Sequence, residues 1–157
     1  MKRLPLLAIV AITIVIDQLA KHLVRMTLAV SPPKHYGLLT LLYAENSGAF
    51  LSLGANLPPH TRSLIFSGLV AVALAFGLYA LLTNRVGSKA DTIAVAFILG
   101  GGIGNLIDRV ARGGRVTDFL YLAAGPLHTG VFNVADVAIT GGVIFLLLSW
   151  MVAKRES

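Results

Sequence analysis

Four of the seven acidic residues lie inside or at the ends of apolar segments, where a carboxylate is costly. On insertion scales, a charged side chain at the centre of a bilayer costs about 2.5–3.5 kcal/mol, and less near the interface. Because this placement needs compensation, a functional site is the first hypothesis for these acids. They are Asp17, Asp108, Asp118 and Asp136.

Asp118 and Asp136 are the pair best suited to chemistry. Asp118 has apolar neighbours in RVTDFLYL, and 17 residues without a formal charge follow Asp136. A segment with Gly125 and Pro126 joins the two acids, so both can face each other at one membrane interface. Two carboxylates held close share a proton. An aspartic peptidase needs this pair, because the ionised member activates water and the protonated member donates to the scissile carbonyl.

The other two acids have structural explanations. Asp17 lies one helical turn before Lys21, so the two can form an i,i+4 ion pair that faces the interior of a bundle. Asp108 is preceded by Asn105 and followed by Arg109, which is typical of a satisfied polar cluster at a helix end. Both acids therefore also fit a purely structural role.

Asp136 has a structural alternative too. Asn133 can be the N-cap of the last helix and Asp136 its N3 acid, a variant of the capping box. Other hydrolase chemistries fit worse, because the chain has no H-E-x-x-H, no G-x-S-x-G and no cysteine. The histidines are dispersed without metal-ligand spacing: His22, His35, His60 and His128.

The elements that must position these acids are membrane helices. The chain has 157 residues, is 56% hydrophobic and has a mean hydropathy of +0.81, which indicates an all-α membrane protein in a single domain, residues 1–157. No A-x-A-like site closes the first apolar stretch, so we expect a retained span and not a cleaved signal peptide. The expected four-transmembrane-helix bundle has spans at about 4–26, 63–84, 90–107 and 132–153.

The segments between the spans differ in character. YGLLTLLY and GAFLSLG, between the first two spans, predict short strands at the membrane surface, a small β-rich extracytoplasmic segment. The glycine, arginine and proline of VARGGRVTDFLYLAAGPLHTG predict irregular backbone before the fourth span. Gly100 and Gly104 have the small-xxx-small spacing that lets helices approach closely.

The formal net charge of +6 does not indicate a nucleic-acid partner, because the basic residues are scattered at span ends without a continuous stripe. Lys2, Arg3 and the basic turn from Arg85 to Lys89 favour cytoplasmic termini.

Five ordered motifs, DQLAK, ENSGAF, GGIGNLIDR, VTDF and FNVAD, cover nearly the whole chain. In order and approximate spacing the chain resembles the lipoprotein signal peptidases, or signal peptidase II. The resemblance implies a membrane aspartic endopeptidase with four spans and cytoplasmic termini in the bacterial inner membrane, and it implies no metal or organic cofactor. We expect the chain to work as a monomer among the membrane lipids. Its substrates would be prolipoproteins, cleaved near the outer face just before a diacylglyceryl-modified cysteine.

By the same resemblance, Asp118 and Asp136 are the catalytic pair. The residues that would bind substrate or support the site are Asp17, Lys21, Asn46, Gly48, Asn105, Asp108, Arg109 and Asn133. We further expect the segment from Asn46 to Leu53 to cradle the substrate peptide. Thr117 departs from the family, which often has an aliphatic residue there, so a paralogue with narrower substrate preference stays open.

Two other functions stay open. One is a small proton-coupled transporter or channel subunit, in which the four buried acids form a proton relay. The absence of inverted repeats speaks against it. The other is a catalytically silent paralogue, against which the sequence offers only the presence of both aspartates.

Overall fold

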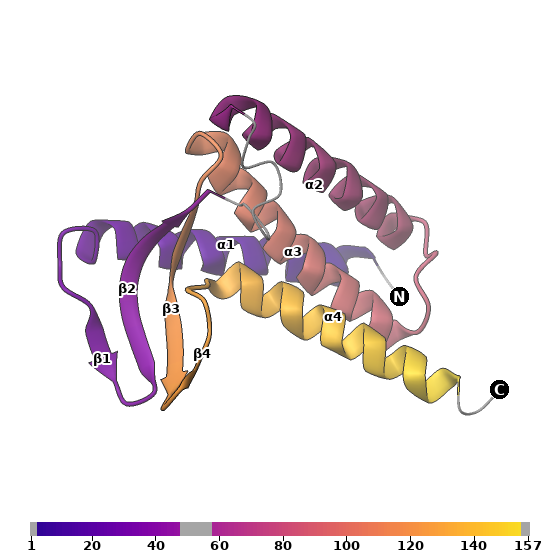
Figure 1. Ribbon diagram of the computed structural model, residues 1–157. Coiled ribbons are helices and arrows are strands. Elements are labelled where there is room, and N and C mark those ends of the chain that lie inside the picture. Colours follow the sequence, from indigo (N-terminus) through magenta and orange to yellow (C-terminus); the bar gives the residue numbers. More distant parts are fainter. Residues whose placement is uncertain (1–2, 48–57, 155–157) are drawn as a thin grey trace.

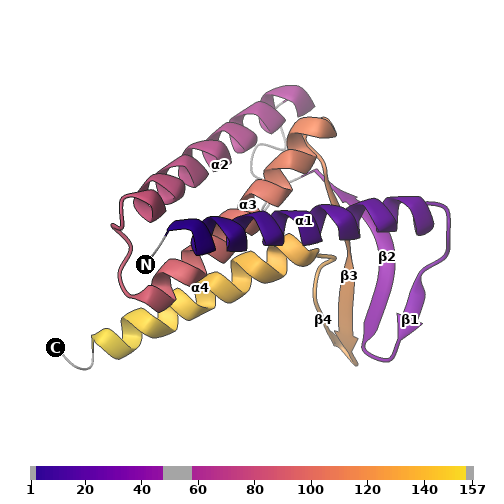
Figure 2. The ribbon, with the colours of Figure 1, turned by 180° about the vertical axis from the view of Figure 1, so that it is seen from behind.

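The computed structural model describes residues 3–47 and 58–154, which form a helical bundle with a small sheet at one end. Both termini and the connection between α2 and α3 lie at the opposite end of the bundle (Figures 1 and 2). The helices are α1 Arg3–Thr27, α2 Pro59–Leu82, α3 Lys89–Ala111 and α4 Val134–Ala153. The strands are β1 Lys34–Tyr36, β2 Leu39–Asn46, β3 Val116–Ala124 and β4 Leu127–His128.

Helix α3 is the central helix and packs against α1, α2 and α4. The predicted glycine spacing explains the close approach to α1. A Cβ at Gly100 would lie 2.6 Å from the Cβ of Thr13, and a Cβ at Gly104 would lie 2.6 Å from Oδ2 of Asp17. On the α4 side, a Cβ at Gly101 would run into the carbonyl oxygen of Ala135. Small residues on α3 therefore bring the backbones of three helices together.

Three helices, α1, α3 and α4, are long and apolar enough to cross a membrane. In α2 the uncharged apolar stretch is shorter, Ser67–Leu82. The helices bury Leu6, Leu81 and Leu99 in a shared core but leave many large apolar side chains exposed, as expected of a surface that faces lipid and not water.

The four strands form one antiparallel sheet in the order β1-β2-β3-β4. The strand prediction between the first two spans is confirmed for β1 and β2, whereas GAFLSLG lies outside the described residues. The prediction of irregular backbone after the third span is wrong, because β3 is a nine-residue strand. Its backbone pairs with β2, which is distant in sequence, with Asp118 opposite Ala44. Gly125, at φ +61°, provides the turn to β4.

Candidate active site

The side chain of Asn133 joins the two candidate catalytic aspartates. Its Nδ2 donates to Oδ1 of Asp118 at 2.6 Å, and its Oδ1 accepts from the backbone N–H of Asp136 at 3.0 Å. In return, Oδ2 of Asp136 accepts from the backbone N–H of Asn133 at 3.1 Å. The predicted capping box of α4 is therefore confirmed, and the same asparagine also holds Asp118. The structural and the functional interpretation of Asp136 are compatible.

Asp118 lies on β3 and is 2% exposed. Burial raises the pKa of its carboxyl group above the ordinary value, and the nearby charge of Asp136 acts in the same direction. Hydrogen bonds from Asn46 and Asn133 act against that rise, because they stabilise the ionised form. The Asn46 contact joins Nδ2 to Oδ2 of Asp118 at 3.0 Å, and it comes from the end of the neighbouring strand.

Asp136 occupies the first turn of α4 and is half-buried. Its Oδ1 accepts from Nδ2 of Asn105, on α3, at 2.8 Å. The partial positive charge at the helix N-terminus favours a carboxylate at this position. The two aspartates therefore differ in surroundings, since Asp118 is nearly inaccessible on a strand and Asp136 lies at the positive end of a helix dipole.

A buried cation, Lys21, donates a hydrogen bond to one of the asparagines of the site. Lys21 is 0% exposed, and its Nζ donates to Oδ1 of Asn105 at 2.7 Å. The same ammonium group lies 2.8 Å from Oδ2 of Asp17, the predicted i,i+4 pair. Oδ1 of Asp17 accepts from the backbone N–H of Ala135 at 3.0 Å. The pair thus does more than stabilise α1, because it orients Asn105 and fixes the start of α4.

Asp108 supports the other side of the site. Its Oδ2 accepts from the backbone N–H of Thr117 at 2.9 Å, one residue before Asp118. Nη1 of Arg25 lies 3.6 Å from Oδ1 of Asp108 and donates to the hydroxyl of Thr117 at 3.2 Å. The polar side chain of Thr117 is thus explained in this chain, because it is fully buried and its hydroxyl accepts a hydrogen bond from Arg25.

Sequence reasoning missed Arg25 and Gln18. Nε2 of Gln18 donates to Oδ2 of Asp17 at 3.2 Å and to the carbonyl of Gly104 at 3.0 Å. Arg25 was detectable, because residues 17, 21 and 25 follow the four-residue spacing of one helix face. Gln18 is adjacent to Asp17 and off that face, so spacing alone did not indicate it.

The two remaining residues of the predicted site are Arg109 and Gly48. Arg109 is half-buried and close enough to Asp108, Asp118 and Asp136 for electrostatic attraction. It places a positive charge beside the candidate pair. Gly48 lies outside the described residues, as does the rest of the segment after Ser47.

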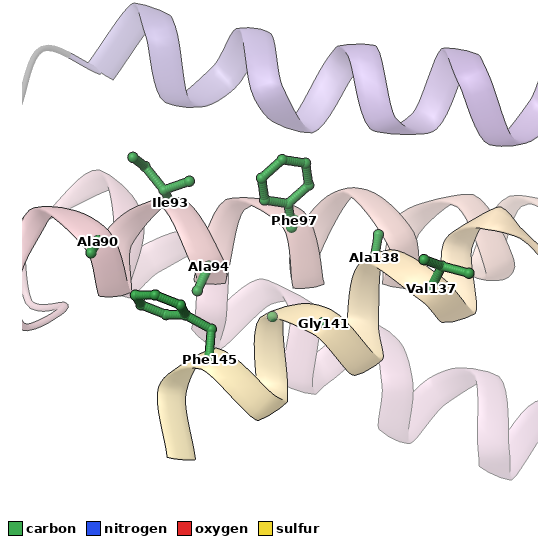
Figure 3. A pocket seen from close by; sticks show the side chains of 9 residues that line it. Ala90, Ile93, Ala94, Phe97, Val137, Ala138, Gly141 and Phe145 are labelled. Carbon is green, nitrogen blue, oxygen red and sulfur yellow. The ribbon is translucent and has the colours of Figure 1, made fainter. Parts of the chain in front are cut away.

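No group of three or more histidines and acids that could hold a metal ion occurs among the described residues. An apolar groove of about 520 Å³ lies between α3 and α4, with Phe97 and Phe145 in its lining (Figure 3). It contains no side chain that can transfer a proton, so it is not the candidate active site. The candidate active site is therefore the cluster of Asp118, Asn133 and Asp136.

Comparison with known proteins identifies the family. The family model for signal peptidase (SPase) II matches residues 9–152. The chain is 35% identical to the lipoprotein signal peptidase of Syntrophus aciditrophicus over 147 residues, which are 92% of this chain and 91% of that protein. It is 39% identical to the lipoprotein signal peptidase of Sphingopyxis alaskensis over 143 residues, 87% of this chain and 79% of that protein.

The fold is also that of a solved bacterial membrane enzyme, determined by the in meso method at 2.3 Å resolution. The two align with a TM-score of 0.79 at 22% identity, over 98% of this chain and 91% of the other. Since the family model matches residues 9–152, a range that includes both aspartates and their three asparagines, this multi-pass bacterial membrane protein belongs to the signal peptidase II family.

Proposed function

We propose that this chain is an aspartic endopeptidase that removes the signal peptide from prolipoproteins, cutting just before a diacylglyceryl-modified cysteine. The observation that carries the proposal is the hydrogen bonding of Asp118 and Asp136 to one asparagine, Asn133, at the sheet end of the bundle. Membership of the signal peptidase II family and the names of the relatives support the substrate class.

The surroundings of the two aspartates suggest their roles. We assign the role of proton donor to Asp118, because burial on β3 raises the pKa of its carboxyl group, and the role of general base to Asp136, in the first turn of α4. Asp136 takes a proton from water as the water oxygen attacks the scissile carbonyl, and Asp118 donates its proton to the carbonyl oxygen. Collapse of the resulting diol returns one proton to Asp118, while Asp136 protonates the departing amide nitrogen. Both groups then regain their starting states.

The surrounding residues would keep the pair reactive. Asn105 and Asn133 orient the two carboxylates, and neither can take a proton from them. Lys21, Asp17 and Asp108 fix those asparagines and the start of β3. Arg109 supplies a positive charge that favours an ionised member. These are supporting roles, because the proton transfers need only the two aspartates and water.

We further propose that α2 also crosses the membrane, which gives four spans in total. Both termini would then lie in the cytoplasm, and the aspartates would lie near the outer face. Basic residues at the termini end support this orientation: Arg3, Arg85, Lys89 and Lys154. The chain has no cysteine, so the labelling of a single introduced cysteine shows on which side of the membrane that position lies. A membrane-impermeant maleimide should label Lys34→Cys on intact cells and Lys89→Cys only after permeabilisation. The reverse pattern would refute the orientation.

A proton relay across the membrane is less well supported. Between Arg3 and Asp17 the first helix has no charged residue, a distance of about 21 Å at 1.5 Å per residue. The buried carboxylates Asp17, Asp108 and Asp118 instead lie in one cluster, because Lys21 contacts both Asp17 and Asp108 and Asp108 binds the backbone N–H of Thr117, next to Asp118. A relay would need titratable groups along that gap.

Cleavage by the purified protein in detergent tests the proposed function. The substrate is a prolipoprotein carrying the diacylglyceryl group, and its matched control is the same precursor without the lipid. We expect mass spectrometry to find one cut, just before the modified cysteine, and only in the lipidated precursor. Equal cleavage of both precursors would refute the lipid-dependent assignment, and cleavage elsewhere would refute the proposed cut site.

A further inference from the structure

The apolar groove between α3 and α4 begins beside the candidate active site. It has a volume of about 520 Å³, and no residue of its lining is charged or polar. On α4 the lining starts at Val137, the residue that follows Asp136, and ends at Phe145 (Figure 3). The eight residues from Val137 to Phe145 correspond to about 12 Å along the helix axis. We call this feature the α3–α4 groove.

Two neighbouring glycines on α4 shape the α3–α4 groove. A Cβ at Gly142 would lie 2.8 Å from the carbonyl oxygen of Ala94, so the two helices touch at this level. A Cβ at Gly141 would have no atom within 4 Å, so this glycine leaves free volume in the groove. Phe97 is 41% exposed and Phe145 is 43% exposed. The groove is therefore open at the side, where a membrane helix faces lipid, and a chain can enter it from the bilayer.

The dimensions of the groove fit a hydrocarbon chain of one leaflet. Helix α4 has 20 residues and is about 30 Å long, which matches the hydrocarbon thickness of a bilayer. The groove covers about 12 Å of that length from the aspartate end, slightly less than one leaflet. A helix about 10 Å in diameter would need roughly 900 Å³ to be enclosed over the same length. A hydrocarbon chain fits inside the groove, whereas a signal-peptide helix could only lie across its opening.

We propose that the α3–α4 groove binds one acyl chain of the diacylglyceryl group on the substrate. The inference rests on the proposed function and orientation, which place the lipid-modified cysteine at the aspartates and the aspartates near the outer face. A chain attached to that cysteine starts near Asp136 and extends towards the bilayer centre, the direction in which the groove runs from Val137 to Phe145. Cleavage then depends on the lipid, because a precursor without the chain lacks these packing contacts.

Photocrosslinking of the wild-type protein tests where the chain lies. The full-length protein in detergent is mixed with a precursor whose acyl chains carry a diazirine at mid-chain, and the sample is irradiated before turnover. We expect peptide mass spectrometry to find adducts on α3 and α4, at or beside Phe97 and Phe145. Adducts mainly on α1 or α2 would overturn the assignment. Equal labelling of the groove by a phosphatidylcholine with the same diazirine chain would show a general lipid site and would also overturn it.

Gly141→Leu tests the role of the groove in turnover, because the added side chain fills free volume in the groove. Gly68→Leu is the matched control, since Gly68 on α2 also has open space around its Cβ and does not line the groove. Two precursors are compared, one with palmitoyl chains and one with butyryl chains, which are too short to pass Gly141. In Gly141→Leu the ratio of kcat/KM for palmitoyl over butyryl should fall roughly tenfold, the change that corresponds to about 1.4 kcal/mol.

Gly68→Leu should keep the wild-type ratio. An unchanged ratio in Gly141→Leu, or an equal fall in both variants, would overturn the groove assignment, while cleavage by wild type would leave the proposed function standing. A wild type that cleaves neither precursor would refute the proposed function and this inference with it. Thermal unfolding in detergent checks that both variants are folded, and the crosslinking result with wild type stands if either is not.

Discussion

Replacing Lys21 with methionine removes a buried cation and leaves its partners in place. The ammonium group is 2.8 Å from Asp17, which is also 0% exposed, and 2.7 Å from Oδ1 of Asn105. Methionine fills a similar volume, so the main loss is electrostatic. Breaking a buried pair on one side costs about 3–5 kcal/mol. At about 2–4 °C per kcal/mol for a chain of this size, the unfolding midpoint should fall by roughly 6–20 °C.

The assay is thermal unfolding of the purified protein in detergent, followed by the helical circular dichroism signal. Lys34→Met is the matched control, because Lys34 is exposed on β1 and should change stability by about 0.5 kcal/mol or less. Adding Asp17→Asn to Lys21→Met should recover part of the loss, since it removes the uncompensated charge. The reasoning is refuted if Lys21→Met unfolds at the same temperature as Lys34→Met.

Three further predictions follow from single contacts. Asn46→Ala removes a donor that lowers the pKa of Asp118, so the alkaline limb of the kcat–pH profile should move to higher pH; an unchanged limb would contradict this. Hydrogen bonds from Tyr43, Arg115 and Arg112 lower the pKa of Glu45 from 4.5 to about 2. The contribution of the Glu45 carboxylate to folding stability is therefore complete above pH 4.5 and is lost as the pH falls towards 2. In Glu45→Gln the thermal unfolding midpoint should therefore change less between pH 4.5 and pH 2 than in wild type. The same pH dependence in both proteins would contradict this prediction. Gly101→Ala should destabilise the protein by about 1–3 kcal/mol, because the added Cβ meets the carbonyl of Ala135. Gly141→Ala is the control and should not, because the space around its Cβ is open. Equal thermal unfolding midpoints for the two variants would count against that packing.

The sequence predicted the local features of the site well. Three of these features depend on residues within one or two helical turns of each other. They are the capping box of Asn133 and Asp136, the Asp17–Lys21 ion pair and the glycine spacing on α3. Such contacts follow from helix geometry alone. The expectation that acids in apolar segments are shielded from solvent also needs only their position in the sequence, and Asp17, Asp108 and Asp118 are indeed buried.

The long-range features could not be predicted in this way. Strand β3 pairs with β2 across 70 or more residues, so no local pattern indicated the pairing. The glycines and arginines that precede the strand therefore resembled irregular backbone. Local spacing also did not indicate that Asn133 holds both aspartates, because its bond to Asp118, 15 residues earlier in the chain, exists only when β3 and α4 meet. The contact between Arg25 and Thr117 likewise needs the tertiary fold, which places the end of α1 beside β3.

The catalytic assignment of the two aspartates is tested most directly by cleavage of a diacylglyceryl-modified prolipoprotein by wild type, Asp118→Asn and Asp136→Asn. Asparagine keeps the size of each side chain but can neither take nor supply the required proton. We expect cleavage by wild type and none by either variant, with all three proteins folded and able to bind the substrate. Near wild-type rates in either variant would contradict the account.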